Sequence, residues 1–125
     1  MPLGGKKQVE EIDARGIHPV IIPDPGDAGA IDVSHSGYVE LTTAAAETRT
    51  LADPTYRGQL LDLVFITDVG DCVVTTASAM NQTGNNTVTF ADVGDHQQLV
   101  GIADGPTGSF EWREIANDGA ALSTV

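Results

Sequence analysis

The sequence predicts an all-β protein, an antiparallel β-sandwich or barrel-like domain preceded by an extended N-terminal arm. The first observation is that short segments rich in Val and Thr recur from residue 31 onward, starting about 9 to 15 residues apart. The second is that clusters of Gly, Asn and Asp separate these segments, as is typical of sandwiches and barrels. The third is that the Ala-rich stretch at residues 43–47 is too short to form a stable helix.

The individual strands follow from this punctuation. The expected strands are residues 38–42, 47–51, 60–66, 72–77, 87–91, 98–103, 110–116 and 121–125. Only Asp62 interrupts the apolar residues of 60–66, which predicts a central strand covered on both faces. Val88 and Phe90 share one face of their strand, and Phe110 and Trp112 share one face of theirs. These alternations predict a core with one solvated side.

Residues 1–30 differ from residues 31–125, so we divide the chain into an arm and a β domain. Three prolines between residues 19 and 25 restrict the backbone to extended geometry. The same segment is too apolar for a solvated linker, and its candidate interface residues are Ile17, Val20, Ile21, Ile22 and Pro23. The arm then packs either on its own domain or on a neighbouring subunit. We expect removal of residues 1–24 to leave the β domain folded.

The composition of the chain limits the classes of partner and the cellular setting that we expect. The 125 residues suffice for one domain, and the formal net charge is -12. Such an acidic chain is not expected to bind nucleic acid or anionic membranes, because both attract cationic surfaces. The N-terminal residues lack the apolar core of a secretory signal, and no apolar run is long enough to span a membrane. Cys72 is the only cysteine, so an intrachain disulfide is impossible, and we interpret it as a small buried hydrophobe.

The tetrapeptide Asp-Val-Gly-Asp occurs twice, at residues 68–71 and 92–95, each time between two apolar segments. Asp accepts hydrogen bonds from nearby backbone N–H groups, and Gly adopts positive φ without strain. A calcium loop would need more oxygen ligands at a defined spacing than either copy supplies. We therefore predict two hairpin corners and not a metal site.

No catalytic constellation stands out. His18, His35 and His96 lack metal-ligand spacing, and no serine lies in a G-x-S-x-G motif. The sequence therefore predicts no catalytic, metal-binding or cofactor-binding residues, and the chain is expected not to be an enzyme.

Two segments nevertheless resemble motifs of the trimeric dUTP pyrophosphatases. The matching residues are Gly29 and Asp32 in one segment, and Asp53, Tyr56, Arg57 and Gly58 in the other. The phosphate-binding G-R-S-S segment that should lie between them is absent, and so is the glycine-rich C-terminal arm. This resemblance implies an alternative function, hydrolysis of dUTP, with a cleavage assay as its test.

A second resemblance covers roughly the last 90 residues and points to small virion proteins of tailed phages. It is carried by A-E-T-R-T-L-A-D-P-T-Y-R-G-Q-L-L (46–61), G-D-C-V-V-T-T (70–76), N-Q-T-G-N-N-T-V-T-F (81–90), G-D-H-Q-Q-L-V-G-I (94–102) and W-R-E-I-A-N-D-G-A-A-L-S (112–123). It implies a decoration, or cement, protein on the capsid exterior, made in the host cytoplasm. The implied partners are the major capsid protein and two further copies of the chain in a homotrimer.

A third reading is a carbohydrate-binding or head-fibre module. Such a module would use exposed aromatic side chains, and Trp112, Tyr38 and Tyr56 are the candidates. A glycan array, with Trp112→Ala as the variant, tests this reading.

Overall fold

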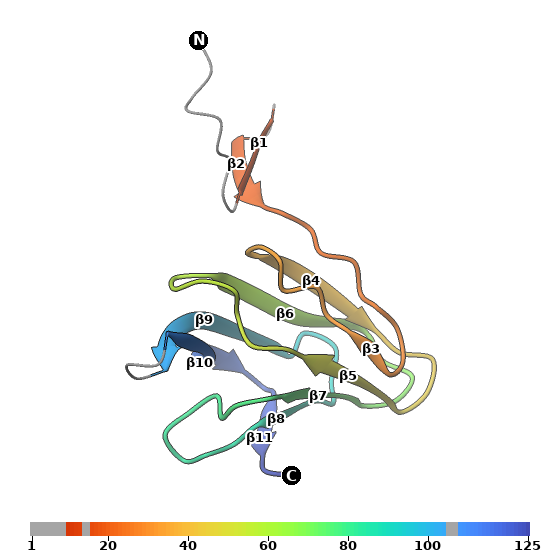
Figure 1. Cartoon of the computed structure of the whole chain (residues 1–125). Coiled ribbons are helices and arrows are strands. Elements are labelled where there is room, and N and C mark those ends of the chain that lie inside the picture. The colour runs from red at the N-terminus through yellow and green to blue at the C-terminus, as the bar shows by residue number, and fades with distance from the viewer. Residues whose placement is uncertain (1–9, 14–15, 105–107) are drawn as a thin grey trace.

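The computed structural model of the chain describes residues 10–13, 16–104 and 108–125. These residues form eleven strands and no helix (Figure 1). The strands are β1 (Glu10–Asp13), β2 (Gly16–Pro19), β3 (Gly29–Ala30), β4 (Gly37–Thr42), β5 (Glu47–Leu51), β6 (Leu60–Thr67), β7 (Cys72–Thr76), β8 (Thr87–Phe90), β9 (His96–Asp104), β10 (Ser109–Asp118) and β11 (Ala121–Ser123). The all-β class is confirmed. In the described part of the chain, no helix could cross a membrane.

Two sheets pack face to face as a sandwich, and neither closes into a barrel. The four-stranded sheet has the order β10-β9-β6-β4, and the five-stranded sheet has the order β11-β8-β7-β5-β3. Antiparallel pairing, as predicted, joins β10 to β9, β9 to β6, β11 to β8 and β8 to β7. The pairs β4–β6, β5–β7 and β3–β5 are parallel, so both sheets are mixed and the antiparallel description needs correcting.

The parallel pairs have a simple topological cause. From β3 to β7 the chain crosses to the opposite sheet after each strand. Each crossing reverses the direction of the chain, so strands that are two apart in sequence run the same way in the same sheet. Regular strand spacing with turn residues between predicts the strands well, but it does not tell a hairpin from a crossing between sheets.

The core lies between the two sheets. The four-stranded sheet contributes Leu41, Leu63, Phe65, Leu99 and Trp112, and the five-stranded sheet contributes Leu51, Cys72, Val74, Val88 and Phe90. The Phe65 and Phe90 rings meet across the two layers, with centroids 6.5 Å apart and an interplanar angle of 56°. The predicted core faces are confirmed for Val88, Phe90 and Trp112, whereas Phe110 is only half-buried; Cys72 is buried as expected.

The prediction that residues 60–66 form a central strand covered on both faces is half correct. β6 is central in its sheet, between β9 and β4. Its inward side chains are buried, but its outer face is not covered: Leu60 is 42% exposed and Ile66 is 40% exposed. The apolar residues on the outer side of β6 therefore lie on a partly exposed face, where Asp62 separates Leu60 from Val64 and Ile66.

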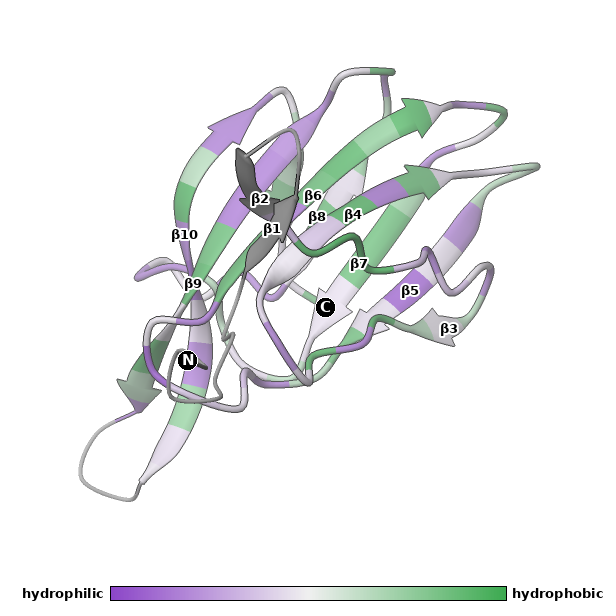
Figure 2. Cartoon of the chain, turned by 90° about the horizontal axis from the view of Figure 1, so that it is seen from above, coloured by the Kyte–Doolittle hydropathy of each residue, from purple (hydrophilic) through white to green (hydrophobic). Residues whose placement is uncertain are grey.

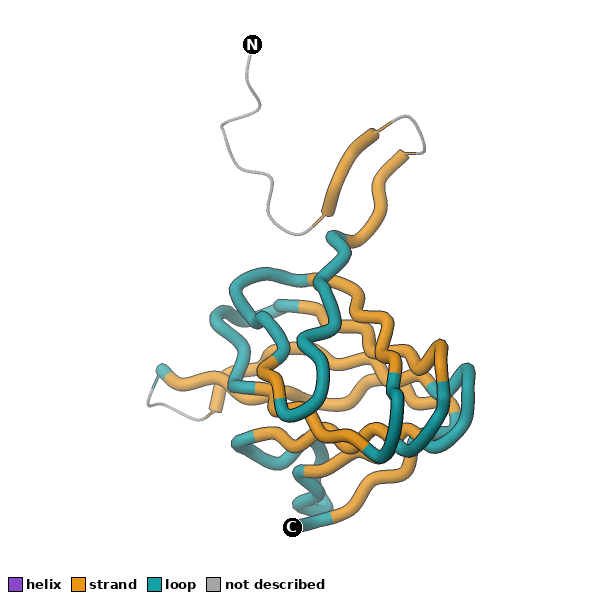
Figure 3. The backbone as a smooth tube through the Cα atoms, turned by 90° about the vertical axis from the view of Figure 1, so that its right-hand side faces the viewer, coloured by secondary structure: helices purple, strands orange, loops and turns teal. Residues whose placement is uncertain are grey.

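The N-terminal region contains two parts. β1 and β2 pair antiparallel in a separate two-stranded sheet, which projects away from the sandwich (Figures 1 and 3). Residues 20–30 then run along the sandwich and end in β3 at the edge of the five-stranded sheet. The sequence pattern does not predict β1, β2 or β3.

Candidate functional site

The root of the arm is fixed to the edge of the four-stranded sheet. The N–H of Tyr38 donates to the carbonyl of Val20, and the N–H of Ile22 donates to the carbonyl of Tyr38, both at 2.9 Å. Ile22 is 1% exposed and fills the space beside Gly37, where a Cβ would lie 2.5 Å from its Cδ1 atom. Ile22 therefore belongs to the core of its own sandwich.

Of the other predicted interface residues, the structure describes the side chains of Val20, Ile21 and Pro23 but not that of Ile17. Ile21 is 56% exposed, Pro23 is exposed and Val20 is half-buried. Ile17 lies in β2 opposite Ile12 of β1. The structure thus separates the predicted set into one core anchor, Ile22, and an exposed residue beside it, Ile21, with the β1–β2 hairpin beyond.

A buried ionic clasp holds the next part of this segment. The Arg49 side chain is fully buried, and its Nε donates to Asp24 Oδ1 at 2.7 Å. Its Nη2 donates to Asp24 Oδ2 at 3.1 Å and lies 2.9 Å from Glu47 Oε1. The N–H of Thr42 donates to Asp24 Oδ2 at 2.9 Å. The clasp therefore ties this part of the arm to strands of both sheets.

The electrostatics of the clasp explain why it tolerates burial. Burial alone raises the pKa of Asp24, but the Arg49 guanidinium and the N–H groups of Thr42 and Gly26 outweigh it and hold that pKa below its usual value. Hydrogen bonding to Asp24 is the main cause of the raised pKa of Arg49. An unpaired charge left in this position would be strongly destabilising, so both partners are needed.

These contacts correct the expectation for removal of residues 1–24. That truncation deletes the buried Ile22 and leaves the Arg49 guanidinium without Asp24. Both losses destabilise the sandwich, the first by a cavity and the second by leaving the buried guanidinium with only part of its charge compensation, from Glu47. A shortened chain whose first residue is Val20 lacks the β1–β2 hairpin and keeps the root.

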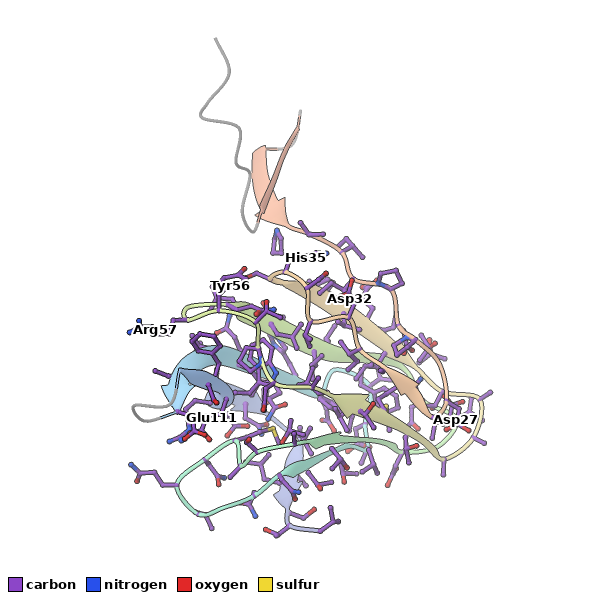
Figure 4. All side chains as sticks on the ribbon, in the orientation of Figure 1. Asp27, Asp32, His35, Tyr56, Arg57 and Glu111 are labelled. Carbon is purple, nitrogen blue, oxygen red and sulfur yellow. The ribbon has the colours of Figure 1, made fainter. Side chains whose placement is uncertain are left out.

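The residues that resemble the dUTP pyrophosphatase motifs lie mostly in loops at one end of the sandwich. Asp32 accepts a hydrogen bond from the N–H of Ser34 at 2.9 Å, and the Tyr56 hydroxyl lies 2.8 Å from Ser36 Oγ. Arg57 is exposed and points away from the body, at the opposite end from Asp27 (Figure 4). Gly58 has a φ of +82°, which a tight turn requires. Asp53 is half-buried before this turn, and Gly29 lies in β3.

Gln59 ties the two loops together, a role that no sequence motif indicates. Its amide nitrogen donates to the carbonyls of Val33 and His35, at 2.8 and 3.1 Å. Its amide oxygen accepts from the N–H of Thr55 at 2.8 Å. Gln59 is fully buried, so these bonds satisfy a side chain that would otherwise be costly in the core. The arrangement explains the two motif-like segments as loop structure.

His35, His96 and Cys72 form no cluster, and the side chain of His18 lies outside the part of the chain that the structure describes. His96 Nε2 lies 3.0 Å from Asp62 Oδ1 on the outer face of the four-stranded sheet, and His35 lies in a loop. Among the described residues, no group of three His, Cys, Asp or Glu side chains is placed to hold a metal ion. Burial raises the pKa of the Cys72 thiol to about 11, which leaves little thiolate at neutral pH.

Trp112 does not offer a sugar-binding platform. Its side chain is buried in the core, and its indole N–H donates to the carbonyl of Ala52 at 2.8 Å. Tyr38 and Tyr56 are half-buried, on β4 and in the loop before β6. The carbohydrate-binding hypothesis therefore loses its main candidate, because Trp112 is a core residue. For the same reason, replacing Trp112 would remove a core side chain.

The two Asp-Val-Gly-Asp segments are corners, but not hairpin corners. Residues 68–71 lead from β6 in the four-stranded sheet to β7 in the five-stranded sheet, and residues 92–95 lead back from β8 to β9. The N–H of Gly94 donates to the carbonyl of Phe65 at 2.8 Å, so both turns lie at the same end of the sandwich. Each copy thus closes the core by carrying the chain between layers.

One sequence signal could have located the ionic clasp. Thr48 and Thr50 point outward from β5, so Arg49 between them must point into the core. A charged residue at an inward position needs a buried partner, and the acidic residues near the arm were candidates. The sequence alone did not identify Asp24 as that partner, because 25 positions separate the two residues.

No protein-family model matches the chain, and no curated protein matches its sequence.

Proposed function

We propose that this chain is a structural virion protein: a decoration protein that binds the outer surface of a tailed-phage head as a homotrimer, with the major capsid protein as its partner. The observation that carries the proposal is a projecting hairpin whose root is clamped to a compact sandwich. The resemblance of residues 46–61, 70–76, 81–90, 94–102 and 112–123 to phage virion proteins supplies the class.

The hairpin supports a role in contacts with neighbours. β1 and β2 form a separate two-stranded sheet, and an isolated hairpin of this size is only marginally stable in water. A surface on a neighbouring molecule would stabilise it. The prolines of the root restrict its conformations in the free chain, which lowers the entropy lost on docking.

Charge supports a position on the outside of a particle. Residues 1–19 carry three basic and three acidic residues, and the whole net charge of -12 therefore belongs to the sandwich. Such a body is repelled by packaged DNA and remains soluble at high copy number.

Attachment to particles is the direct test. Tailed-phage particles would be purified on a density gradient from the host that makes the chain, and the chain quantified in them by mass spectrometry. We expect a fixed, saturable copy number per head. Absence of the chain from intact particles would contradict the proposal.

The arm is tested by rebinding to particles from which the chain has been stripped. We expect the shortened chain that starts at Val20 to bind at least ten-fold more weakly than the full chain, while its melting temperature stays within a few degrees of that of the full chain. Ile21→Ser should weaken rebinding as well, whereas Ile66→Ser, a matched change of a 40% exposed isoleucine at the far end of β6, should not. Rebinding of the truncated chain at full occupancy would remove the arm from the proposal.

A further inference from the structure

The two outer faces of the sandwich differ in charge. The outer face of the four-stranded sheet carries Glu40, Asp62, His96, Glu111 and Arg113. The outward side chains of the five-stranded sheet are uncharged, and we call this surface the neutral face; its centre consists of Ala30, Thr48, Thr50, Val73, Thr75 and Thr89. In Figure 2 hydrophilic segments colour β9 and β10 and β7 is pale to green; β5 is hydrophilic in part as well, because the colour includes residues such as the inward-facing Arg49.

The neutral face is ordered and continuous. Ala30, Thr50 and Thr75 lie opposite one another in register across β3, β5 and β7. Thr48, Val73 and Thr89 form a second row across β5, β7 and β8. An open hollow of about 310 Å³ lies on this face, lined by residues of β3, β5 and β7 and of the loops that follow β5 and β7. The hollow is large enough to receive a side chain from a neighbouring molecule.

The neutral surface extends beyond the sheet. Residues 72–91 and 119–125 contain no charged residue, which adds the loop between β7 and β8 and the C-terminal segment. The Asn85 amide donates to Thr124 Oγ1 at 3.0 Å, so these two parts lie together. The sheet face alone covers roughly 350 Å² of flat area by strand spacing, less than the ~800 Å² per partner of a typical stable interface. The added loop and C-terminus are therefore needed.

We propose that copies of this chain associate through the neutral face, which lies around the symmetry axis of the homo-oligomer. In a symmetric assembly, residues near the axis meet their own copies, so a charge placed there faces itself. A chain with a net charge of -12 can bring copies together only where this repulsion is absent. The acidic residues of the opposite sheet are about 10 Å or more away, across the core. At the rim of the neutral face one carboxylate is close, since Asp27 Oδ1 accepts from the N–H of Thr48 at 3.0 Å.

This inference deepens the proposed function and depends on it only in requiring self-association, so it is tested without particles. Sedimentation velocity of the purified full chain between about 1 and 100 µM would measure association. We expect an oligomer that tightens from 0.1 to 0.5 M NaCl, because salt screens the surrounding carboxylates. Weakening by salt would overturn the proposal, because it would indicate that Lys6, Lys7 and Arg15 hold the copies together instead. A monomer at all concentrations would overturn it as well.

Matched charge variants locate the contact. Thr50→Glu and Ala77→Glu each add one negative charge on exposed positions of the neutral face, and Leu60→Glu adds the same charge on the other sheet. We expect at least ten-fold weaker association for the first two and an unchanged value for the third, with circular dichroism and melting temperature confirming that all three fold. Equal weakening by all three, or no weakening by the first two, would overturn the proposal. Association that behaves as expected in a chain that fails to bind particles would contradict the proposed function and leave this inference standing.

Discussion

The two Asp-Val-Gly-Asp turns allow the same four residues to be compared in two places. Both turns carry the chain from one sheet to the other at the same end of the sandwich. In sequence they are identical, and the local rules for Asp and Gly in turns apply equally to both. Their contacts differ in almost every respect.

The backbone of each turn is satisfied by a different side chain. In the second copy Asp95 is buried, and its Oδ2 accepts from the N–H groups of Ala91 and Asp92, at 2.9 and 3.1 Å. In the first copy the equivalent Asp71 is exposed. In the first copy Thr43 satisfies the backbone of the turn. Its hydroxyl donates to the carbonyl of Gly70 at 2.6 Å and accepts from the N–H groups of Val69 and Gly70.

The two glycines are required for different reasons. Gly94 has a φ of +98°, and a Cβ there would meet nothing within 4 Å. At Gly70 a Cβ would lie 2.4 Å from both the carbonyl carbon of Ala45 and the backbone nitrogen of Ala46. The first turn requires glycine because the backbone of residues 45 and 46 leaves no space for a Cβ. The second turn requires glycine because its φ is positive. The tetrapeptide therefore specifies a turn, while its surroundings decide which of its atoms matter.

The largest effect is expected at Gly70. Gly70→Ala forces a methyl group against the backbone of residues 45 and 46, which cannot move aside as a side chain can. We expect the free energy of unfolding to fall by about 3 kcal/mol, at the upper end of the usual range for overpacking. Urea denaturation of the variant and the wild type measures this difference. A loss below about 1 kcal/mol would show that the two turns are equivalent after all.

Removal of the side chain that satisfies each turn comes next. Asp95→Ala leaves the N–H groups of Ala91 and Asp92 without their acceptor, and we expect a loss of about 2 kcal/mol. Thr43→Val makes the equivalent deletion in the first turn and should cost a similar amount. Asp95→Asn, which keeps a side-chain acceptor, is the control and should lose less than half as much. Chemical denaturation at constant pH gives all three values.

Much of this fold follows from local sequence, as the strands show. β4 to β11 agree with the segments predicted from alternation and turn residues to within a few residues, because those signals act within one strand. The pairing of the strands could not be read in the same way. Both Asp-Val-Gly-Asp segments satisfy the rules for a hairpin, yet each joins strands of different sheets, since a turn residue does not record where the next strand packs.

The N-terminal region shows the same limit for the candidate site. The prolines and isoleucines of residues 17–25 correctly indicated an extended segment that needs a surface. They did not show that Ile22 enters the core or that Asp24 pairs with Arg49, because both contacts join positions far apart in sequence. The absence of charge between residues 72 and 91 was visible in the sequence, but it becomes a surface only when alternate residues of β7 and β8 are seen to share an outer face.

A smaller effect is expected at Gly94, and it separates conformation from space. Gly94→Ala places an L-residue at a φ of +98°, outside the regions that such residues prefer. The added methyl group meets open space, so only the backbone term remains. We expect a loss of about 1 kcal/mol in the free energy of unfolding. If Gly94→Ala destabilised the protein more than Gly70→Ala, conformation and not close approach would dominate both turns.

The smallest effect is expected at Asp71, the residue that corresponds to Asp95. Asp71→Ala removes an exposed carboxylate from a turn whose N–H groups are already bonded to Thr43, so no buried donor loses its partner. The change should alter the free energy of unfolding by less than about 0.5 kcal/mol, as for most surface substitutions. In a chain with a net charge of -12 the loss of one negative charge also relieves repulsion, which can make the variant slightly more stable at low salt. Parallel melts of Asp71→Ala and Asp95→Ala, at 0.05 and 0.5 M NaCl, measure the two terms. A loss at Asp71 equal to that at Asp95 in high salt would mean that the repeated sequence, and not its surroundings, sets the energetics of both turns.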